Sequence, residues 1–231
     1  MSFGRNLQGL RKMRNKMTQE ELAEHLGVSR QTVSKWELDL GYPEMDKVIE
    51  LCSFFSCTMD ELIRGDLNIS DDTYSDTRKE TVNAFSYIKY AVISKEPETD
   101  AINHVKEWGK ELGMTEIEVL GWDYSFLSQE QINVLHMHGY EAALIVDEEL
   151  ARKIKEQPEI FQQEEQEYIS ISIRKPIKEP FRLIPNAYKS LMTHMKINGM
   201  KPKQDKNIIG CFEKEYVKDG IEYMGIYLAV E

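Results

Sequence analysis

The segment from Thr18 to Glu37 constrains the fold of this chain more than any other stretch, and it reads TQEELAEHLGVSRQTVSKWE. Thr18 can cap a short helix, with Glu21 three residues later as the return partner of a capping box. Gly27 supplies the positive φ angle that a tight turn demands, and Ser29 can cap the helix that follows. The segment therefore predicts two short helices joined by a tight turn.

The second of these helices has an apolar side and a polar side. Val33 and Trp36 point back toward a core. The outward side then carries Arg30, Gln31, Ser34 and Lys35, with Thr32 near its rim. Because glutamine and arginine can each make bidentate contacts to adenine or guanine edges, this side is a candidate for reading the major groove of DNA.

The segment resembles the Cro/repressor-like (XRE) helix-turn-helix family, and the resemblance extends over residues 5–65 through TQEELA, VSRQTVSKWE, YPEMDKVIEL and TMDELIRGD. It implies an all-helical DNA-binding head. In that head Arg30, Gln31 and Lys35 would read bases, and Gln19, Thr32 and Ser34 would touch phosphates. The resemblance also implies that Glu37 pairs with a basic residue of the first helix, either Arg11 or Lys12. The competing interpretation is a helical bundle whose polar face is merely solvated.

The charge distribution agrees with a nucleic-acid partner, although the net charge of the chain is −11. Residues 1–36 hold seven basic and three acidic side chains, a net charge of +4, so the remaining 195 residues carry −15. A short basic end on an acidic body suits a small DNA-reading head, because the body itself repels polyanions.

Composition excludes several other classes of protein. No apolar run approaches the roughly 18 residues that span a bilayer, and the N-terminus lacks the apolar stretch of a signal peptide. The three cysteines fit neither a disulfide framework nor a paired zinc motif, and Cys52 and Cys57 are expected to be small core residues. We therefore expect a cytoplasmic protein with no metal and no cofactor.

The sequence predicts two domains that differ in secondary structure. Residues 1–66 are helical, the polar segment 67–82 is a predicted linker, and residues 83–231 form an α+β body. Within the body, a strand–helix–strand–strand order occurs twice, with a cleft expected between the two halves. The strands are predicted at 85–93, 117–124, 140–146, 169–173, 208–216 and 223–230, and the helices at 98–112 and 185–198. Residues 147–167 are predicted to be an exposed connection, helical at most at its start, and the 169–173 strand to be half-buried.

The body resembles, more loosely, the GyrI-like effector-binding domain over about residues 82–231. The resemblance rests on the segments LGWDY at 120–124 and FEKEY at 212–216, on the helix around Tyr188, and on the ending YMGIYLAVE. It implies a cleft for amphipathic, often cationic, small molecules, with an acidic residue matching Glu213 at its base. Gly225 departs from the pattern, because an aspartate is usual there. The expected ligand-binding residues are Trp122, Tyr124, Tyr188, Phe212, Glu213 and Tyr227.

Glu213 also stands out from the residues alone. In an extended strand it shares a face with Ile209 and Cys211, which places a carboxylate on an apolar surface. Burying that carboxylate unpaired is costly unless it is protonated or meets a cationic guest. The competing interpretation is that the aromatic residues are core and that this face, which also holds Glu215, is solvated.

No nucleophile–base pair and no phosphate-binding glycine loop is evident in the sequence. The preferred hypothesis is therefore a transcription regulator, dimeric on DNA, whose operator affinity responds to a small molecule, rather than an enzyme. Two alternatives remain. One is a detoxifying hydrolase with Glu213 as its base, and the other is a regulator whose body only oligomerises.

Overall fold

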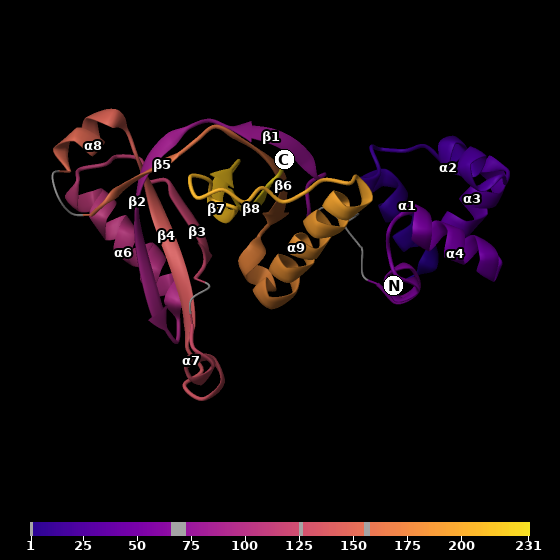
Figure 1. Ribbon diagram of the computed structural model, residues 1–231, viewed down its shortest axis with the longest axis horizontal. Coiled ribbons are helices and arrows are strands. Elements are labelled where there is room, and N and C mark those ends of the chain that lie inside the picture. The colour runs from indigo at the N-terminus through magenta and orange to yellow at the C-terminus, as the bar shows by residue number, and fades with distance from the viewer. Residues whose placement is uncertain (1, 66–72, 125–126, 155–157) are drawn as a thin grey trace. The chain divides into compact units, whose positions relative to one another are not determined.

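The computed structural model describes residues 2–65, 73–124, 127–154 and 158–231 (Figure 1). Contacts between residues divide the chain into two compact units. The first unit comprises residues 1–78, 169–201 and 231, and the second comprises residues 79–168 and 202–230. Among the described residues, no helix combines the length and the apolar character needed to cross a bilayer.

The first unit begins with the helical head that the sequence predicts. Its helices are α1 (Phe3–Met13), α2 (Gln19–Leu26), α3 (Arg30–Glu37), α4 (Met45–Phe54) and α5 (Met59–Arg64). Capping boxes at Thr18 and Thr58 start α2 and α5, and Gly27 ends α2 with a φ of 64°. The apolar sides of the helices meet in one core that includes Leu7, Leu10, Leu22, Leu26, Val33, Leu51, Phe55 and Leu62.

The same unit contains the long helix α9 (Pro180–Ile197), which follows the short 3-10 helix η1 (Pro176–Lys178). The sequence prediction began this helix at Pro185, but Pro180 starts it, because proline fits the first helical position and lacks an N–H that would otherwise be unpaired there. The C-terminal end of α9 packs on the head. Ile197 is part of the head's core, and the Asn198 side chain donates a hydrogen bond to the Met13 carbonyl, 2.9 Å away.

The predicted linker, residues 67–82, lies outside the described residues as far as position 72. Beyond that it is ordered, which corrects the prediction. The Ser75 N–H donates to the Ser172 carbonyl at 2.9 Å, the Arg174 N–H donates to the Thr73 carbonyl at 2.7 Å, and Arg78–Val82 form strand β1. Backbone pairing of this kind requires no apolar side chains, so the polar composition did not reveal it.

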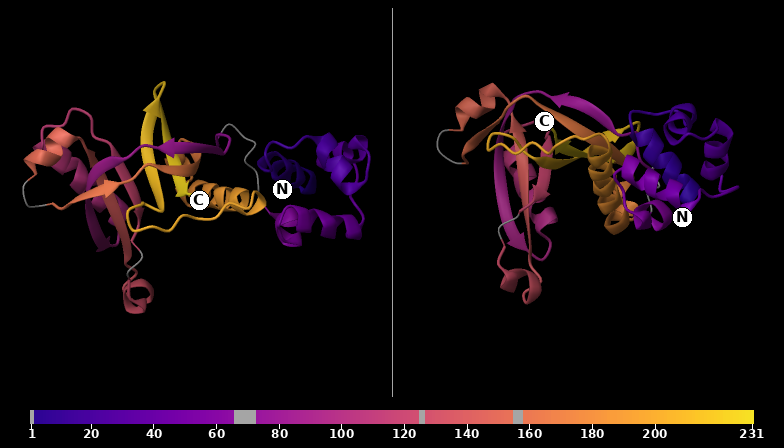
Figure 2. Two further views of the ribbon diagram at one scale, coloured as in Figure 1. Left: turned by 45° about the horizontal axis from the view of Figure 1, so that its top comes forward. Right: turned by 45° about the vertical axis from the view of Figure 1, so that its right-hand side comes forward.

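The second unit is built on an antiparallel sheet (Figure 2). Its strands are β2 (Phe85–Ser94), β3 (Val119–Asp123), β4 (His138–Val146), β5 (Ile160–Gln163), β7 (Cys211–Lys218) and β8 (Ile221–Ala229), and they lie in the order β8-β7-β3-β4-β2-β5. The helices of this unit are α6 (Pro97–Glu111), α7 (Gln129–Asn133) and α8 (Glu148–Lys153).

The predicted double repeat is confirmed by the element order. The first repeat is β2-α6-β3-β4, and the second is β6-α9-β7-β8, with β6 spanning Gln166–Arg174. Strand β3 of the first repeat pairs with β7 of the second, at Leu120 opposite Lys214 and Gly121 opposite Glu213. Asp219 and Gly220, both with positive φ, form the tight turn between β7 and β8.

The sheet of the second unit has two differently packed faces. Helix α6 covers one face, called the α6 face here, where Ile88, Val105, Ala142 and Leu144 form a core (Figure 1). The opposite face holds a second core, with Tyr87, Leu120, Ala143, Tyr168 and Phe212. A residue's function in this unit therefore depends on the face to which it points.

Two strand predictions need correction. The segment 147–167 is not merely an exposed connection, since it contains β5, which pairs with β2. The buried Gln163 side chain of β5 accepts a hydrogen bond from the Ile209 N–H, 2.8 Å away. Because a buried position of this strand is polar, the alternation of apolar and polar residues did not indicate a strand here. Strand β6 is buried on both sides rather than half-buried, because Ser170 and Ser172 are small enough to pack inside.

Candidate DNA-binding helix and ligand-binding face

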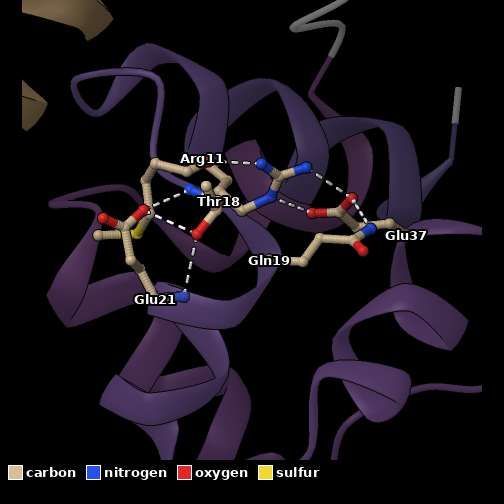
Figure 3. A network of polar contacts seen from close by, with 6 residues as sticks. Arg11, Thr18, Gln19, Glu21 and Glu37 are labelled. Carbon is tan, nitrogen blue, oxygen red and sulfur yellow. Dashed lines mark hydrogen bonds and ion pairs between the residues drawn. The ribbon is translucent and has the colours of Figure 1, made fainter.

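Helices α2 and α3 form the predicted helix-turn-helix, and local hydrogen bonds fix both starts. The Thr18 hydroxyl accepts from the Glu21 N–H, while the Glu21 carboxylate accepts from the Thr18 N–H (Figure 3). The hydrogen bonds that the Thr18 N–H and hydroxyl donate to the Glu21 carboxylate lower its pKa. The Ser29 hydroxyl caps α3 by accepting from the Thr32 N–H at 3.1 Å. The first residues of both helices are thus fixed by side-chain caps.

A buried ion pair holds α3 against α1. Arg11 donates from Nε and Nη2 to the two carboxylate oxygens of Glu37, at 2.6 and 2.9 Å, and the side chains are only 9% and 1% exposed (Figure 3). The Gln19 amide donates a third bond to Glu37, at 2.9 Å. The sequence left Arg11 and Lys12 open as partners of Glu37, and in the structure the partner is Arg11. The bidentate geometry of this pair fixes the orientation of α3.

The outward side of α3 presents the residues predicted to read DNA. Arg30, Gln31 and Lys35 are exposed, whereas Thr32 and Ser34 are half-buried. The Thr32 hydroxyl lies 2.9 Å from that of Ser29, so it also supports the cap. Base contacts by the first three, and phosphate contacts by Gln19, Thr32 and Ser34, stay predictions.

The predicted ligand-binding residues do not share one surface. Phe212 packs in the core of the opposite face, where it stacks on Tyr227 with ring centres 4.5 Å apart. Trp122 also packs there. Glu213 lies on the α6 face, because it pairs with Gly121, which in turn pairs with Ala142 of the α6-face core. Adjacent strand residues point to opposite sides, so Phe212 and Glu213 cannot line the same surface of the sheet.

The remaining two predicted residues lie elsewhere. Tyr124 directly follows β3, and its Cβ is close to Gly139, where an added Cβ would lie within 3.0 Å of it. Tyr188 lies on α9, in the other unit. Ile209, expected beside Glu213, packs instead with Phe212, because β7 begins only at Cys211 and the alternation does not extend back to it.

Glu213 receives a hydrogen bond on its own face. The Tyr140 hydroxyl donates to Glu213 Oε2 at 3.3 Å, and Tyr140 itself is buried. Gly121 makes this contact possible, since a Cβ at that position would lie 2.2 Å from the Tyr140 hydroxyl oxygen. Glu213 is half-buried, so a positively charged group could still reach it from solvent.

Further carboxylates surround Glu213 on the α6 face. Burial raises the pKa of the Glu98 carboxyl, and the charges of Glu215 and Asp123 raise it further, although part of Glu98 remains exposed. Burial likewise raises the pKa of the Cys211 thiol, with contributions from Asp123 and Glu213. Glu215 and Asp123 are therefore close enough to Glu98 to disfavour its charge, and Asp123 and Glu213 are both close to Cys211. The α6 face near the β3–β7 junction is therefore an acidic surface that favours cations.

A second half-buried carboxylate, Glu141, is not among the residues that the sequence singled out. It lies among the aromatic residues of the opposite face, where it accepts from Trp122 Nε1 at 2.6 Å and from Lys89 Nζ at 2.9 Å. Burial raises the pKa of the nearby Tyr87 hydroxyl, and Glu141 adds to the effect. The Lys89 ammonium also lies over the Phe161 ring, 4.8 Å from its centre. The carboxylate beside Trp122 thus already has a cation of its own.

The glycine at position 225 has a packing consequence. A Cβ there would come within 2.8 Å of the Tyr227 ring, so the aspartate usual in GyrI-like domains does not fit beside Tyr227 as it is placed here. The ring of Tyr227 fills that space and stacks on Phe212.

Comparison with known proteins identifies the head. Residues 7–62 match the HTH_3 helix-turn-helix family model. The chain is 50% identical over 66 residues to the transcriptional activator BcrR of Enterococcus faecalis, a match that covers 29% of this chain and 32% of BcrR. It is 28% identical over 81 residues to the uncharacterized regulator YqaE of Bacillus subtilis (strain 168), which covers 35% of this chain and 67% of YqaE.

Similarity to solved structures is weaker. The EcmrR–DNA complex, solved by cryo-EM, aligns with a TM-score of 0.47 and 12% identity over 93% of this chain and 85% of that chain. SAV2435 bound to tetraphenylphosphonium aligns with a TM-score of 0.39 and 9% identity over 68% and 94%. The sequence match to the family model is the decisive comparison: residues 7–62, the N-terminal part of this chain, form an HTH_3-type helix-turn-helix domain.

Proposed function

We propose that this protein is a transcription regulator that binds specific DNA through α3 and changes its operator affinity when a small amphipathic cation binds to its body. The observation that carries the proposal is the helix-turn-helix itself. Its second helix exposes Arg30, Gln31 and Lys35, and the buried Arg11–Glu37 pair fixes that helix on α1. A fixed helix with outward arginine and glutamine side chains suits the major groove.

The proposal includes two heads acting together on DNA. A single small head buries too little surface for tight specific binding, and two heads reading two half-sites overcome this limit. We therefore propose a homodimer and an operator with two related half-sites about 10 base pairs apart, or a multiple of that spacing.

The proposed effector site is the acidic surface around Glu213. The charges of Glu215 and Asp123 add to the raised pKa of Glu98, so a cation bound among these carboxylates would relieve the repulsion and favour the charged form of Glu98. The buried Tyr140 hydroxyl donates a hydrogen bond to Glu213 and so helps to hold the carboxylate in place. A role for Tyr188 at this site stays a prediction, and the structure argues against Phe212, which is only 2% exposed, as an open wall.

Helix α9 supports a link between the body and the DNA-binding head. It is the helix of the second repeat, and Glu213 lies on β7, the next strand of that repeat. Its other end enters the head's core through Ile197 and donates to α1 through Asn198. A shift of α9 on ligand binding would therefore act directly on the helix that carries Arg11.

Selection of DNA sequences from a random pool by the full-length chain tests the DNA-binding part. We expect a single enriched motif with two half-sites. Gln31→Ala should then weaken binding to that motif by about 1–3 kcal/mol and leave binding to random DNA nearly unchanged, because a base contact is lost and no phosphate contact is.

The matched control for this experiment is Gln204→Ala, which makes the same chemical change at an exposed glutamine of the second unit. It should leave both affinities unchanged. Absence of an enriched motif, or equal losses on selected and random DNA for Gln31→Ala, would refute base reading by α3.

A further inference from the structure

We propose that Cys52 and Cys57 form a dithiol site that binds a trivalent organic arsenical. The two residues lie at the corner between α4 and α5 of the DNA-binding head, five positions apart in the sequence. The proposal does not depend on the effector site of the body, because both cysteines lie in the head.

The backbone at the end of α4 brings the two thiols together. The Cys57 N–H donates to the Cys52 carbonyl at 3.0 Å, and the Ser56 N–H donates to the Ser53 carbonyl at 3.2 Å. Ser56 between them adopts a left-handed conformation, with a φ of 51°. This pattern is a Schellman motif, in which the first and last residues usually make an apolar side-chain contact. Here both of those positions are cysteines, and each thiol is close enough to contribute to the pKa shift of the other.

The surroundings keep both thiols protonated, which makes them poor ligands for a metal ion. Both cysteines are partly exposed. Burial raises the pKa of the Cys57 thiol to about 12, so it is protonated at neutral pH. Zinc requires thiolates and about four ligands. Within the described parts of the chain, however, no group of three or more His, Cys, Asp or Glu side chains could hold a metal ion.

A trivalent organic arsenical matches two neighbouring protonated thiols. Phenylarsine oxide forms two As–S bonds with a dithiol, its As–O bond breaks, and both thiol protons leave with the oxygen as one molecule of water. Arsenic stays trivalent, so no oxidant or reductant takes part. The aryl carbon and two sulfurs complete its coordination, and no third protein ligand is needed.

Binding there would tie the end of α4 to the start of α5. Cys57 directly precedes Thr58, which caps α5, and both cysteines pack on the core of the head. The site is therefore part of the folded head rather than an exposed tail.

The test is titration of the full-length chain with phenylarsine oxide, followed by intact mass and by the change in absorbance. We expect one phenylarsenic group per chain. Cys52→Ser and Cys57→Ser should each weaken binding by about 100-fold, because the second As–S bond is formed intramolecularly only when both thiols are present. Cys211→Ser is the matched control and should bind as the wild type does.

The wild-type protein supplies a second measurement that is independent of variant folding. Because the Schellman motif holds the thiols together in advance, the native chain should bind about tenfold more tightly than the same chain unfolded in urea. Equal affinity in the native and unfolded states, loss of binding in Cys211→Ser, or unchanged binding in Cys57→Ser would each overturn the proposal.

Discussion

The carboxylate of Glu37 is the residue-scale feature on which the orientation of α3 depends. It is almost fully buried, and Arg11 and Gln19 together donate three hydrogen bonds to it. Removing its charge leaves the Arg11 guanidinium buried without a counter-charge, which is costlier than losing an exposed pair.

We therefore predict that Glu37→Gln lowers the free energy of unfolding by about 3–5 kcal/mol, measured by urea denaturation. The matched control is Glu50→Gln, which breaks the half-exposed pair with Lys47 and should cost at most about 1 kcal/mol. If the two variants proved equally stable, the Arg11–Glu37 pair would not hold α3 in place.

Residue-level predictions from the sequence succeeded where local pattern decided the outcome. Thr18, Gly27 and Ser29 act as predicted because caps and turns depend on neighbouring residues. The separation of Phe212 from Glu213 could also have been predicted, since strand residues alternate between faces. The bond from Tyr140 to Glu213 could not, because the two residues are 73 positions apart and meet only through the pairing of three strands.

At the scale of elements, α9 has an unusual polar stripe. Ser190, His194 and Asn198 follow one another at helical spacing, and one buried atom of each, Oγ, Nδ1 and Oδ1, has no hydrogen-bond partner among the described residues. Burial lowers the pKa of His194. A histidine with a lowered pKa contributes stability that is present above its ordinary pKa of 6.5 and is lost as the pH falls through the folded value.

Acidification should therefore destabilise the protein through α9. We predict that lowering the pH from about 7.5 to 5.5 reduces the free energy of unfolding more in the wild type than in His194→Gln, which cannot acquire the charge. Urea denaturation at the two pH values measures this difference. His138→Gln, at an exposed histidine, is the control and should behave as the wild type. The same pH dependence in His194→Gln as in the wild type would contradict the prediction.

Whole elements were predictable when they were long and strongly patterned. The helical head, α6 and both strand–helix–strand–strand repeats follow from apolar spacing and from breakers. Strands β1 and β5 were not predicted, because they are short, partly polar and stabilised by backbone pairing with distant strands. The start of α9 was predicted at the wrong residue. Proline is typical of the first position of a helix, but Pro185 lies inside α9.

At the scale of the whole molecule, charge is unevenly distributed between the N-terminal head and the rest of the chain. The first 36 residues carry +4 and the rest of the chain −15, so one end attracts a polyanion while the remainder favours cations. In the proposed mechanism a cation bound near Glu213 and an operator bound on α3 are linked through α9. Such linkage is reciprocal, so each partner must change the affinity for the other by the same factor.

The most direct test is the operator affinity of the full-length protein at fixed salt, with and without ligand. The ligands are an aryl trimethylammonium ion and its uncharged carbon isostere. We predict that the cation changes the operator affinity of the wild type by about 5- to 150-fold, a typical coupling, and that the neutral isostere changes it much less. Glu213→Gln should keep its operator affinity without ligand and lose the response to the cation. Equal effects of the two ligands, or an undiminished response in Glu213→Gln, would contradict the account.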